Sequence, residues 1–498
     1  MLAFSADTTD AFAQAGTLDP SFATAGIGIY LPASQNDLGY DLIALPDNRM
    51  LVCGFSSNGG FVTHILEDGT VDASFGEANG TTFFASTVDA MALAPDQSIY
   101  LRGVSADNIF LAHISALGIP DQDFGTDGVI LTPVNATYTQ ISDMVIQPDG
   151  KIVLVGFCNV SATYYNASLF VRFLPDGSLD TGFNGTGILS LADAQSHQYM
   201  RAVAMLDDGS ILGAGYSDNG FTEHLLMSKL HPDGTPDAMF GTAGTLSPSL
   251  GGLNAEAYGM LVNEDGMYVV GYLWENIGNA SAYIAKFNAD GTSDTSFGTN
   301  GSTISDFGSF DYLSNQIAQP DGKIVACGAT APALVATSAL TIRYTTSGLL
   351  DPTYGDGGKT ITTVGIISDG LKGIALEPDG RIVVAGSKSD IHNVNSMMVM
   401  RYLGDGSVGF SASGTSSVQY VVFPDPVTGN SATIGCANAG GAELWITDMR
   451  GRIAGAIVHV PQGATTLELD VKELASGMYL VNVLSQGITS TLKMQVVK

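Results

Sequence analysis

The sequence predicts an all-β fold made of repeated units of short strands. Glycine accounts for 61 of the 498 residues while only 14% are charged, a balance typical of many short strands joined by tight turns. A D-x-x-[FY] motif recurs along most of the chain, and runs rich in β-branched residues stand at a fixed distance from it. A chain of this length indicates several domains or one large repeat architecture.

Two motif series define the repeat. The first joins an aspartate to an aromatic residue three positions later, at Asp19, Asp72, Asp121, Asp180, Asp237, Asp294 and Asp351. The second is a turn resembling Pro-Asp-Gly, with its aspartate at Asp47, Asp96, Asp149, Asp208, Asp265, Asp321 and Asp379. A glycine follows each turn six or seven residues later, at Gly54, Gly103, Gly156, Gly215, Gly271, Gly328 and Gly386. The shared period indicates seven copies of one unit.

Each unit contains four apolar runs of strand length. Residues 373–376 precede a turn, residues 151–155 follow one, residues 398–402 form a third run and residues 128–131 a fourth. Four strands in a unit of roughly 50 to 60 residues are typical of a propeller blade, so we expect a seven-bladed β-propeller. A solenoid is the alternative, but solenoid repeats are usually shorter and need capping repeats, which the sequence does not contain.

A basic residue accompanies every motif aspartate but one. The basic series is His64, His113, Arg172, Lys229, Lys286, Arg343 and Arg401, and in six cases the aspartate lies eight residues downstream, as in Arg172 to Asp180 and Arg343 to Asp351. We expect ion pairs that fix the connection between third and fourth strands. Asp19 has no upstream base and Arg401 no downstream aspartate, so a closed ring pairs these two, with residues 26–31 as the outer strand of the last blade.

Features repeated in every unit favour a structural interpretation over a functional one. The ring of charges could bind a ligand or ion, but pairing within the blade is the better explanation. The motif aromatics are expected to fill the space between adjacent blades rather than to offer a platform for sugars, and the recurring glycines to supply turn dihedral angles.

The units resemble the delta-60 repeat, whose pattern runs L-D-x-x-F-G-x-x-G, then P-D-G-K-I-V-V-A-G, then R-Y-x-x-D-G. The resemblance covers roughly residues 16 to 406, and its best copies begin at Leu179 and Pro378. The first, second and fifth units depart from the pattern, with Asn48 or Gln97 in place of the turn glycine and with Asn263 and Glu264 before Asp265. This resemblance implies a propeller at residues 16–408 and no general enzymatic activity.

A second domain is expected after a linker of small residues at 409–418. Alternating runs at residues 442–446 and 466–470 predict a small Ig-like β-sandwich over residues 419–498. Residues 423–426 (FPDP), 448–452 (DMRGR) and 474–480 (LASGMYL) resemble the type IX secretion C-terminal sorting domain of Bacteroidetes-like bacteria. The resemblance implies the type IX machinery as a partner and a secreted or surface location. An unrelated Ig-like domain of structural use is the alternative.

Other features of the chain restrict its possible location, partners and cofactors. Residues 1–15 are expected to be a truncated signal peptide, on the strength of Ala11-Phe-Ala13, or a disordered N-terminus. The charge of -30 argues against nucleic acid as a partner, and no run of 18 apolar residues predicts a transmembrane segment. The cysteines are expected to be buried thiols. We predict no metal site and no cofactor, since the histidines lack ligand spacing and no calcium loop is present.

No catalytic motif stands out, so the sequence predicts a non-catalytic binding or adhesion module. The alternatives are a carbohydrate-active enzyme with acidic residues at the mouth of the ring, and a purely structural surface-layer protein. Because the loops that follow the strand-ending glycines vary between units, they are expected to carry any ligand site, for a glycan or a protein. Tyr164, Tyr165 and Trp274 are the candidate contacts, with local packing as the alternative for each.

Overall fold

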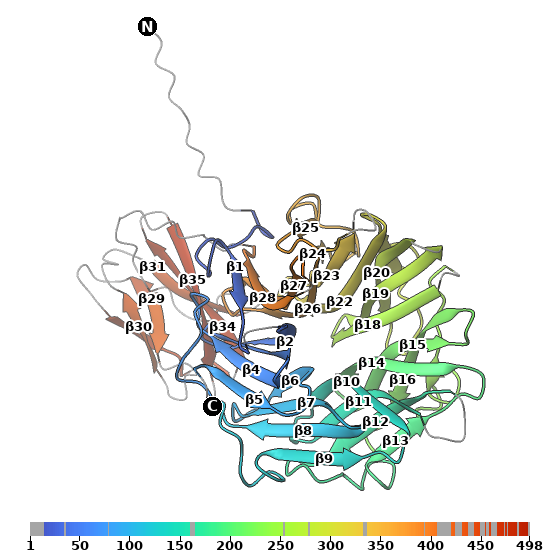
Figure 1. Ribbon diagram of the computed structural model, residues 1–498. Coiled ribbons are helices and arrows are strands. Elements are labelled where there is room, and N and C mark those ends of the chain that lie inside the picture. The colour runs from blue at the N-terminus through green and yellow to red at the C-terminus, as the bar shows by residue number, and fades with distance from the viewer. Residues whose placement is uncertain are drawn as a thin grey trace. The chain divides into compact units, whose positions relative to one another are not determined.

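The chain folds into two compact units, Met1–Phe410 and Ser411–Lys498. The computed structural model describes residues 14–33, 36–77, 79–159, 165–251, 254–276, 279–331, 336–392 and 394–405 of the first unit. In the second unit it describes residues 420–423, 431–436, 443–448, 454, 458–459, 466–472, 474–475, 477–485 and 488–496. All regular elements among these residues are β-strands (Figure 1).

Four-stranded antiparallel sheets, each consistent with a propeller blade, build the first unit. Three of them contain β2 (Leu38–Ala44), β3 (Met50–Ser56), β4 (Gly59–Ile65) and β5 (Thr81–Phe84); β6 (Ala90–Leu93), β7 (Ile99–Ser105), β8 (Asn108–Ile114) and β9 (Val129–Pro133); and β10 (Tyr138–Ile146), β11 (Ile152–Asn159), β12 (Ala167–Phe173) and β13 (Ile188–Leu191). A further sheet contains β14 (His197–Met205), β15 (Ile211–Asp218), β16 (Glu223–Leu230) and β17 (Thr245–Leu246).

Two more four-stranded groups are joined into one larger sheet. They are β18 (Asn254–Asn263), β19 (Gly266–Asn276), β20 (Asn279–Phe287) and β21 (Ser302–Ser305), and β22 (Phe310–Ala318), β23 (Ile324–Ala331), β24 (Ser338–Tyr344) and β25 (Lys359–Thr362). The link between them is a single parallel bridge from Ala280 to Phe310. The first strands of neighbouring groups contact one another, as β14 contacts β18 and β18 contacts β22, and they face the middle of the unit (Figure 1).

The last sheet joins the two ends of the first unit. It contains β26 (Ser368–Leu376), β27 (Ile382–Ser389) and β28 (Asn395–Tyr402), and its outer strand is β1 (Ile27–Tyr30) from the start of the chain. Ile27 lies opposite Met400 and Tyr30 opposite Met397 in the antiparallel register. The N-terminal segment therefore supplies the outer strand of the last sheet, as the sequence predicts.

The hydrophobic core lies between adjacent sheets. One cluster joins Leu42, Val52 and Phe61 of the β2–β5 sheet to Val383 and Val399 of the last sheet, which closes the unit and is called the closing sheet below. Cys53, Cys158 and Cys327 are buried free thiols, as expected. Burial raises the pKa of Cys158 to about 11, so this thiol stays protonated at neutral pH.

The second unit contains two antiparallel sheets. One has the order β29 (Tyr420–Phe423), β30 (Ser431–Cys436), β33 (Thr466–Asp470), and the other β32 (Val458–His459), β31 (Glu443–Asp448), β34 (Gly477–Ser485), β35 (Ile488–Val496). Leu444, Ile446, Leu469 and Val481 are buried. The predicted linker at 409–418 lies outside the described residues.

Candidate functional site

The repeated charges pair within ion-pair distance in every repeat. The pairs, with the nitrogen–oxygen distance, are His64–Asp72 (3.0 Å), His113–Asp121 (2.8 Å), Arg172–Asp180 (2.8 Å), Lys229–Asp237 (3.2 Å), Lys286–Asp294 (3.0 Å), Arg343–Asp351 (2.9 Å) and Arg401–Asp19 (2.9 Å). The second carboxylate oxygen accepts a backbone N–H two residues on, as Asp180 does from Gly182 at 2.9 Å. These pairs close the turn after each third strand.

The arginines of this series also connect neighbouring sheets. Arg401 donates to the carbonyl of Glu67 at 2.6 Å, and Arg172 donates to the carbonyl of Pro232. The guanidinium of Arg401 lies 4.8 Å from the ring centroid of Phe22, a motif aromatic that packs between the closing sheet and the β2–β5 sheet. These arginines thus bind an aspartate of the repeat and a carbonyl of the neighbouring sheet. Together with the motif aromatics, they hold adjacent blades together.

The turns and the D-x-x-F segments occupy one face of the first unit. Lys323, next to the turn aspartate Asp321, lies 3.2 Å from the motif carboxylate of Asp351. Arg381 of another turn lies 3.3 Å from Asp19. We call this side the motif face, and the opposite side, where the second and third strands of each sheet connect, the hairpin face.

The strand-ending glycines correct one sequence-based expectation. None of the seven has a positive φ, so turn geometry does not explain them. A Cβ on Gly386 would instead lie well under 3.0 Å from the carbonyl oxygen of Gly370 in the first strand. Cβ atoms on Gly54, Gly156, Gly215, Gly271 and Gly328 would be equally close to a carbonyl of the first strand, and one on Gly103 to the carbonyl of Thr87, just before β6. They are required by close approach between the first two strands of each sheet.

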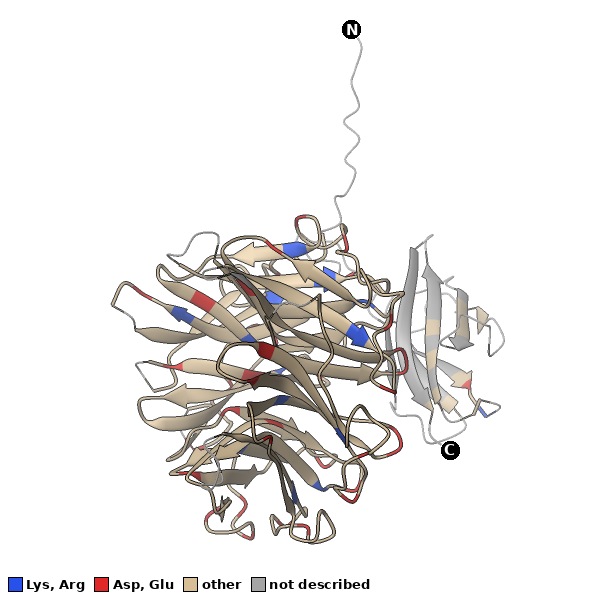
Figure 2. Ribbon diagram, turned by 90° about the vertical axis from the view of Figure 1, so that its right-hand side faces the viewer, with Lys and Arg blue, Asp and Glu red and all other residues tan. Residues whose placement is uncertain are grey.

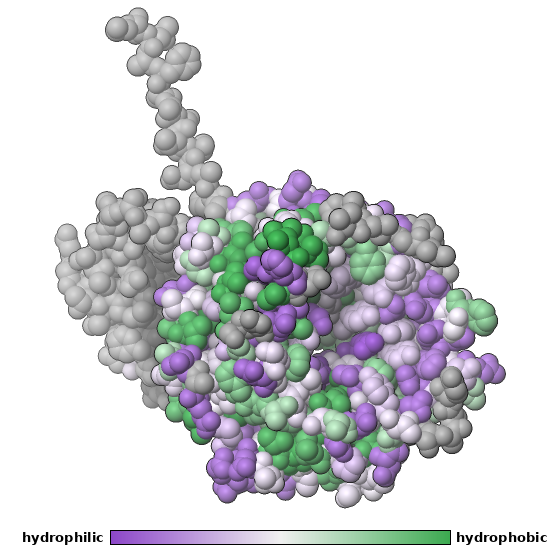
Figure 3. Space-filling view, in the orientation of Figure 1, coloured by the Kyte–Doolittle hydropathy of each residue, from purple (hydrophilic) through white to green (hydrophobic). Residues whose placement is uncertain are grey.

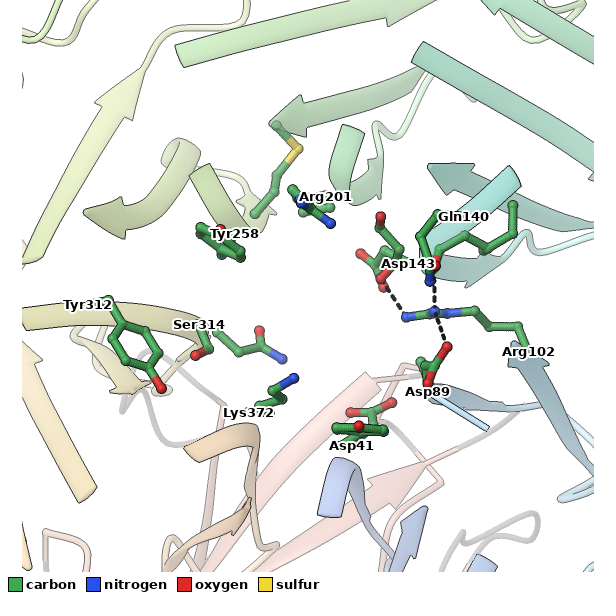
Figure 4. A pocket seen from close by; sticks show the side chains of 18 of the residues that line it. Asp41, Asp89, Arg102, Gln140, Asp143, Arg201, Tyr258, Tyr312, Ser314 and Lys372 are labelled. Atoms are coloured by element: carbon green, nitrogen blue, oxygen red, sulfur yellow. Dashed lines mark hydrogen bonds and ion pairs between the residues drawn. The ribbon is translucent and has the colours of Figure 1, made fainter. Parts of the chain in front are cut away.

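A β-bulge in the first strand lies opposite these glycines. The register shifts by one residue in β2, β10, β14, β18, β22 and β26, and the inserted residues are Tyr40, Ser142, Arg201, Tyr258, Ser314 and Lys372. All six line one central cavity of about 590 Å³ (Figure 4). A bulge re-aims the extra side chain, and here it turns that side chain toward the middle of the unit.

The cavity residues occupy one sequence position that the sequence analysis overlooked. Each inserted residue stands seven positions before a turn aspartate, and Asp89 of the β6–β9 repeat has the same spacing to Asp96. Whereas neighbouring positions recur, this one holds tyrosine, aspartate, serine, arginine or lysine in different repeats. A position whose residue type differs between otherwise regular repeats is the signal that could have identified the cavity.

The β6–β9 sheet contributes to the cavity differently. Strand β6 has no bulge, and Arg102 of β7 replaces the apolar residue that precedes the glycine in the other repeats. Arg102 is 4% exposed, donates to Ile141 O at 2.8 Å and to Ser142 O, and lies 3.7 Å from Asp89. Its guanidinium is therefore engaged by protein groups.

Three carboxyl groups also line the cavity. Asp143 accepts from the backbone N–H groups of Met144 and Val203, both at 2.8 Å, and Asp41 accepts in the same way from Leu42 and Met91. Each thereby ties two neighbouring first strands together. Burial raises the pKa of Asp143 to about 6 against the opposing effect of these hydrogen bonds. Burial likewise raises the pKa of Asp89, which Arg102 counteracts.

Aromatic side chains form a band on the hairpin face. Phe157 and Tyr199 pack edge to face at a centroid distance of 4.8 Å, and the tilted rings of Tyr199 and Tyr216 are also 4.8 Å apart. Farther along, Trp274 lies 5.6 Å from both Tyr272 and Phe310. The aromatic band comprises Tyr138, Phe157, Tyr165, His197, Tyr199, Tyr216, Tyr258, Tyr272, Trp274, Phe310 and Tyr312. Tyr258, Tyr272, Phe310 and Tyr312 line the cavity as well, so band and cavity are continuous.

Arg201 joins the two halves of the band. Its guanidinium carbon lies 5.2 Å from the ring centroid of Phe157 and 5.6 Å from those of Tyr216 and Tyr258. Such positions over ring faces are attractive because of the ring quadrupole. Only one hydrogen bond from its guanidinium, 3.3 Å to the Tyr216 hydroxyl, is found among the described residues.

Two glutamates lie beside the band. Glu256 is 5% exposed and accepts hydrogen bonds from the hydroxyls of Tyr258, at 2.8 Å, and Tyr272. Glu223 shares a hydrogen bond with Glu256, and burial together with this neighbouring carboxyl group raises the pKa of Glu223.

Two of the three predicted ligand contacts fall in this region. Tyr165 lies 5.0 Å from His197 in the aromatic band, and Trp274 belongs to the band as well. Trp274 lies in strand β19, opposite Asn254 and Ala280, and not in a loop as expected, because the β18–β20 strands extend beyond the usual repeat. Tyr164 lies outside the described residues.

Within the described residues, no group of three or more His, Cys, Asp or Glu side chains is placed to hold a metal ion. The same residues include no helix that is long and apolar enough to cross a membrane.

Comparison with known families assigns both parts of the chain. The DUF5122 beta-propeller, a domain of unknown function, matches residues 147–183, 264–297, 319–354 and 377–408. The secretion system C-terminal sorting domain matches residues 421–498. No curated protein matches the chain.

The solved structures that this chain resembles have low identity to it. A catalytically inactive virginiamycin B lyase from Staphylococcus aureus, crystallised with quinupristin, has 11% identity and a TM-score of 0.44, covering 75% of this chain and 99% of its own. PorZ, a surface component of the type-IX secretion system of Porphyromonas gingivalis, has 12% identity and a TM-score of 0.37, covering 90% of this chain and 58% of its own. Sqt1 from Chaetomium thermophilum has 10% identity and a TM-score of 0.36, with 79% and 82% covered.

Proposed function

We propose that this chain, which carries DUF5122 β-propeller repeats and a type IX secretion C-terminal sorting domain and is secreted or attached to the outer surface, is a non-catalytic binding module. It recognises a glycan or a protein on the hairpin face of a seven-bladed propeller. The seven-blade count is supported by the division of the larger sheet into β18–β21 and β22–β25, which a single bridge joins. The two sheets of the second unit support an Ig-like sandwich for residues 419–498.

The observation that carries this proposal is the continuity of the aromatic band with the central cavity. Rigid aromatic surface costs little conformational entropy on binding and offers both apolar and hydrogen-bonding contacts. Most rings of the band lie in strands, which hold them in place, and Figure 4 shows Tyr258 and Tyr312 of the band at the cavity. The space-filling view shows a recess in the middle of one face of this unit, and both polar and apolar residues surround it (Figure 3).

A carbohydrate-active enzyme is the second candidate, because acidic groups do line the cavity. Two observations weigh against it. Asp41 and Asp143 use both carboxylate oxygens on backbone N–H groups, and Glu223 and Glu256 bind each other. Neither arrangement leaves one acid and one base on opposite sides of a scissile bond.

Ligand profiling tests the proposal. The full chain is applied to a glycan array and used to capture cell-surface proteins, beside a Trp274→Ala/Phe310→Ala variant and a Leu117→Ala/Leu349→Ala control that removes exposed apolar side chains near D-x-x-F segments. We expect ligands that the parent and control bind and the band variant loses. Equal binding by both variants, or release of cleaved sugar from a bound glycan, would contradict the proposal.

A further inference from the structure

Two cations in the central cavity form no ion pair with a carboxylate of the described residues. Most lysines and arginines between residues 14 and 405 form ion pairs, including every basic residue of the repeat series. Arg201 and Lys372 form none with any described carboxylate, although both line the cavity. In a chain with a net charge of -30, unpaired cations at this place require an explanation.

The other charged residues of the cavity already have protein partners. Arg102 binds two backbone carbonyls and lies near Asp89, and Asp41 and Asp143 bind backbone N–H groups. Figure 4 shows these residues together on one side of the cavity, with Arg201 and Lys372 on different walls and directed into the open middle. The charged groups left for a ligand are therefore both cationic.

A bound anion would stabilise both cations. The buried Nε of Arg201 has no hydrogen-bond partner among the described residues, and a buried donor without a partner is costly. Burial lowers the pKa of Lys372, and the nearby charges of Arg102 and Arg201 lower it further against the effect of Asp89. A bound anion would satisfy the first group and relieve the repulsion on the second.

The charge of the whole chain limits the ligand. An overall charge of -30 repels a polyanion as it approaches. The acidic residues are spread over turns and strands throughout the blades (Figure 2). A single charged group that enters the cavity avoids most of this repulsion, whereas a row of charges along the surface does not. The ligand should carry one anion at its end.

The groups that continue from the cavity fit sugars. Half-buried rings such as Trp274 and Phe310 attract the C–H face of a pyranose through their quadrupole. The half-buried Glu223 stands beside these rings and can accept hydrogen bonds from hydroxyl groups. A peptide would instead need pockets for alternate side chains or a free strand edge.

We infer that the central cavity binds one carboxylate, carried by the terminal sugar of a glycan whose neutral residues lie along the aromatic band. Arg201 is the main anchor because its planar guanidinium matches a carboxylate, and Lys372 supplies a second positive charge. This inference rests on the proposed binding function and specifies its ligand.

Calorimetric titration of the full chain tests the inference with three matched probes. They are a neutral hexose oligosaccharide ending in one glucuronic acid, its methyl ester, and the same oligosaccharide ending in glucose. We expect the acid-ended probe to bind roughly tenfold or more tightly than the other two. Arg201→Gln and Lys372→Met should remove this preference, while Lys388→Met, which changes a lysine outside the cavity, should leave it intact.

The controls separate this inference from the proposed function. Arg201→Lys keeps the charge and should retain part of the preference, and thermal melting of each variant reports whether the fold is preserved. Equal affinity for the acid-ended and glucose-ended probes would overturn the carboxylate site and leave the binding function standing. Tighter binding of a peptide ending in one carboxylate, or no binding of any sugar probe, would overturn the glycan assignment.

Discussion

The charged pair Arg343–Asp351 exemplifies how single residues stabilise the blades. Arg343 is 0% exposed and Asp351 3% exposed, so both charges are removed from water. Burial by itself raises the pKa of Asp351, but hydrogen bonds from Thr353 and the charge of Arg343 outweigh it and hold the pKa at about 2. Because the folded pKa is below the ordinary value of 3.8, ionised Asp351 stabilises the fold above that value.

The first prediction follows from this shift. Asp351→Asn should lower the free energy of unfolding by about 3 kcal/mol at pH 7, because it leaves a buried arginine with less compensation. The difference from the parent should shrink as the pH falls from about 4 to 2, where the parent carboxylate takes up its proton. Urea unfolding at pH 7, 4 and 2.5 measures this. Asp356→Asn, at an exposed position of the same segment, is the control, and a difference independent of pH would refute the assignment.

The strand-ending glycines are the second feature at the scale of residues. A methyl group at Gly386 would overlap the carbonyl oxygen of Gly370, whereas one at Gly370 would meet only the end of the Tyr312 side chain, at 3.0 Å. We expect Gly386→Ala to lower the free energy of unfolding by about 1–3 kcal/mol or more. Gly370→Ala should lower it much less. Thermal melting of both variants measures the difference. A similar loss of stability in the two variants would show that the bulge does not require the glycine.

At the scale of elements, the first strands carry the variable chemistry and the other strands the frame. The strand runs, the charge pairs and the closing strand are predictable from the sequence because the same residues recur at each repeat. The cavity was not predicted, because Tyr40, Arg201 and Lys372 share a position without sharing a residue type. Recurrence identifies packing, while variation within the repeat identifies the surface open to a ligand.

The aromatic band was predictable only in part, for two physical reasons. Trp274 was singled out as a loop residue, but β-favouring neighbours such as Tyr272 continue the strand through it. Phe310 comes from the next group of strands, β22–β25, and only the arrangement of the repeats in space brings it near Trp274 and Tyr272. Contacts between repeats cannot be read from spacing along one chain.

The third prediction concerns the closing strand. Deletion of residues 1–31 removes β1 and leaves the outer edge of β28 without its partner. Hydrogen exchange of the β28 amides should then become much faster, because their protection depends on the lost pairing. Strand β12, which keeps its outer partner β13, is the internal control. Unchanged protection of β28 would mean that closure does not depend on the N-terminal strand.

At the scale of the whole molecule, two units carry separate tasks. The sorting domain matches residues 421–498 and accounts for secretion or surface attachment, while the repeats and the cavity lie in Met1–Phe410. A chain with a charge of -30 tends to repel other copies of itself and nonspecific anions.

The fourth prediction tests this division. Deletion of residues 411–498 should abolish delivery to the cell surface and leave the first unit with a single cooperative thermal transition, because each sheet of that unit is complete without them. Surface labelling of cells and calorimetry of the purified fragment measure the two effects. Loss of the cooperative transition, or normal surface delivery, would contradict the separation of tasks.

The most direct test of the account is a footprint of the bound ligand. A glycan or protein selected by profiling is added to the full chain, and hydrogen exchange is compared with and without it. We predict slower exchange at the hairpin-face ends of β10, β11, β14, β15, β18, β19 and β22 and no change at the D-x-x-F segments, with the ligand recovered intact. Protection confined to the motif face or to residues 411–498, or chemical conversion of the ligand, would contradict recognition by the aromatic band and the central cavity.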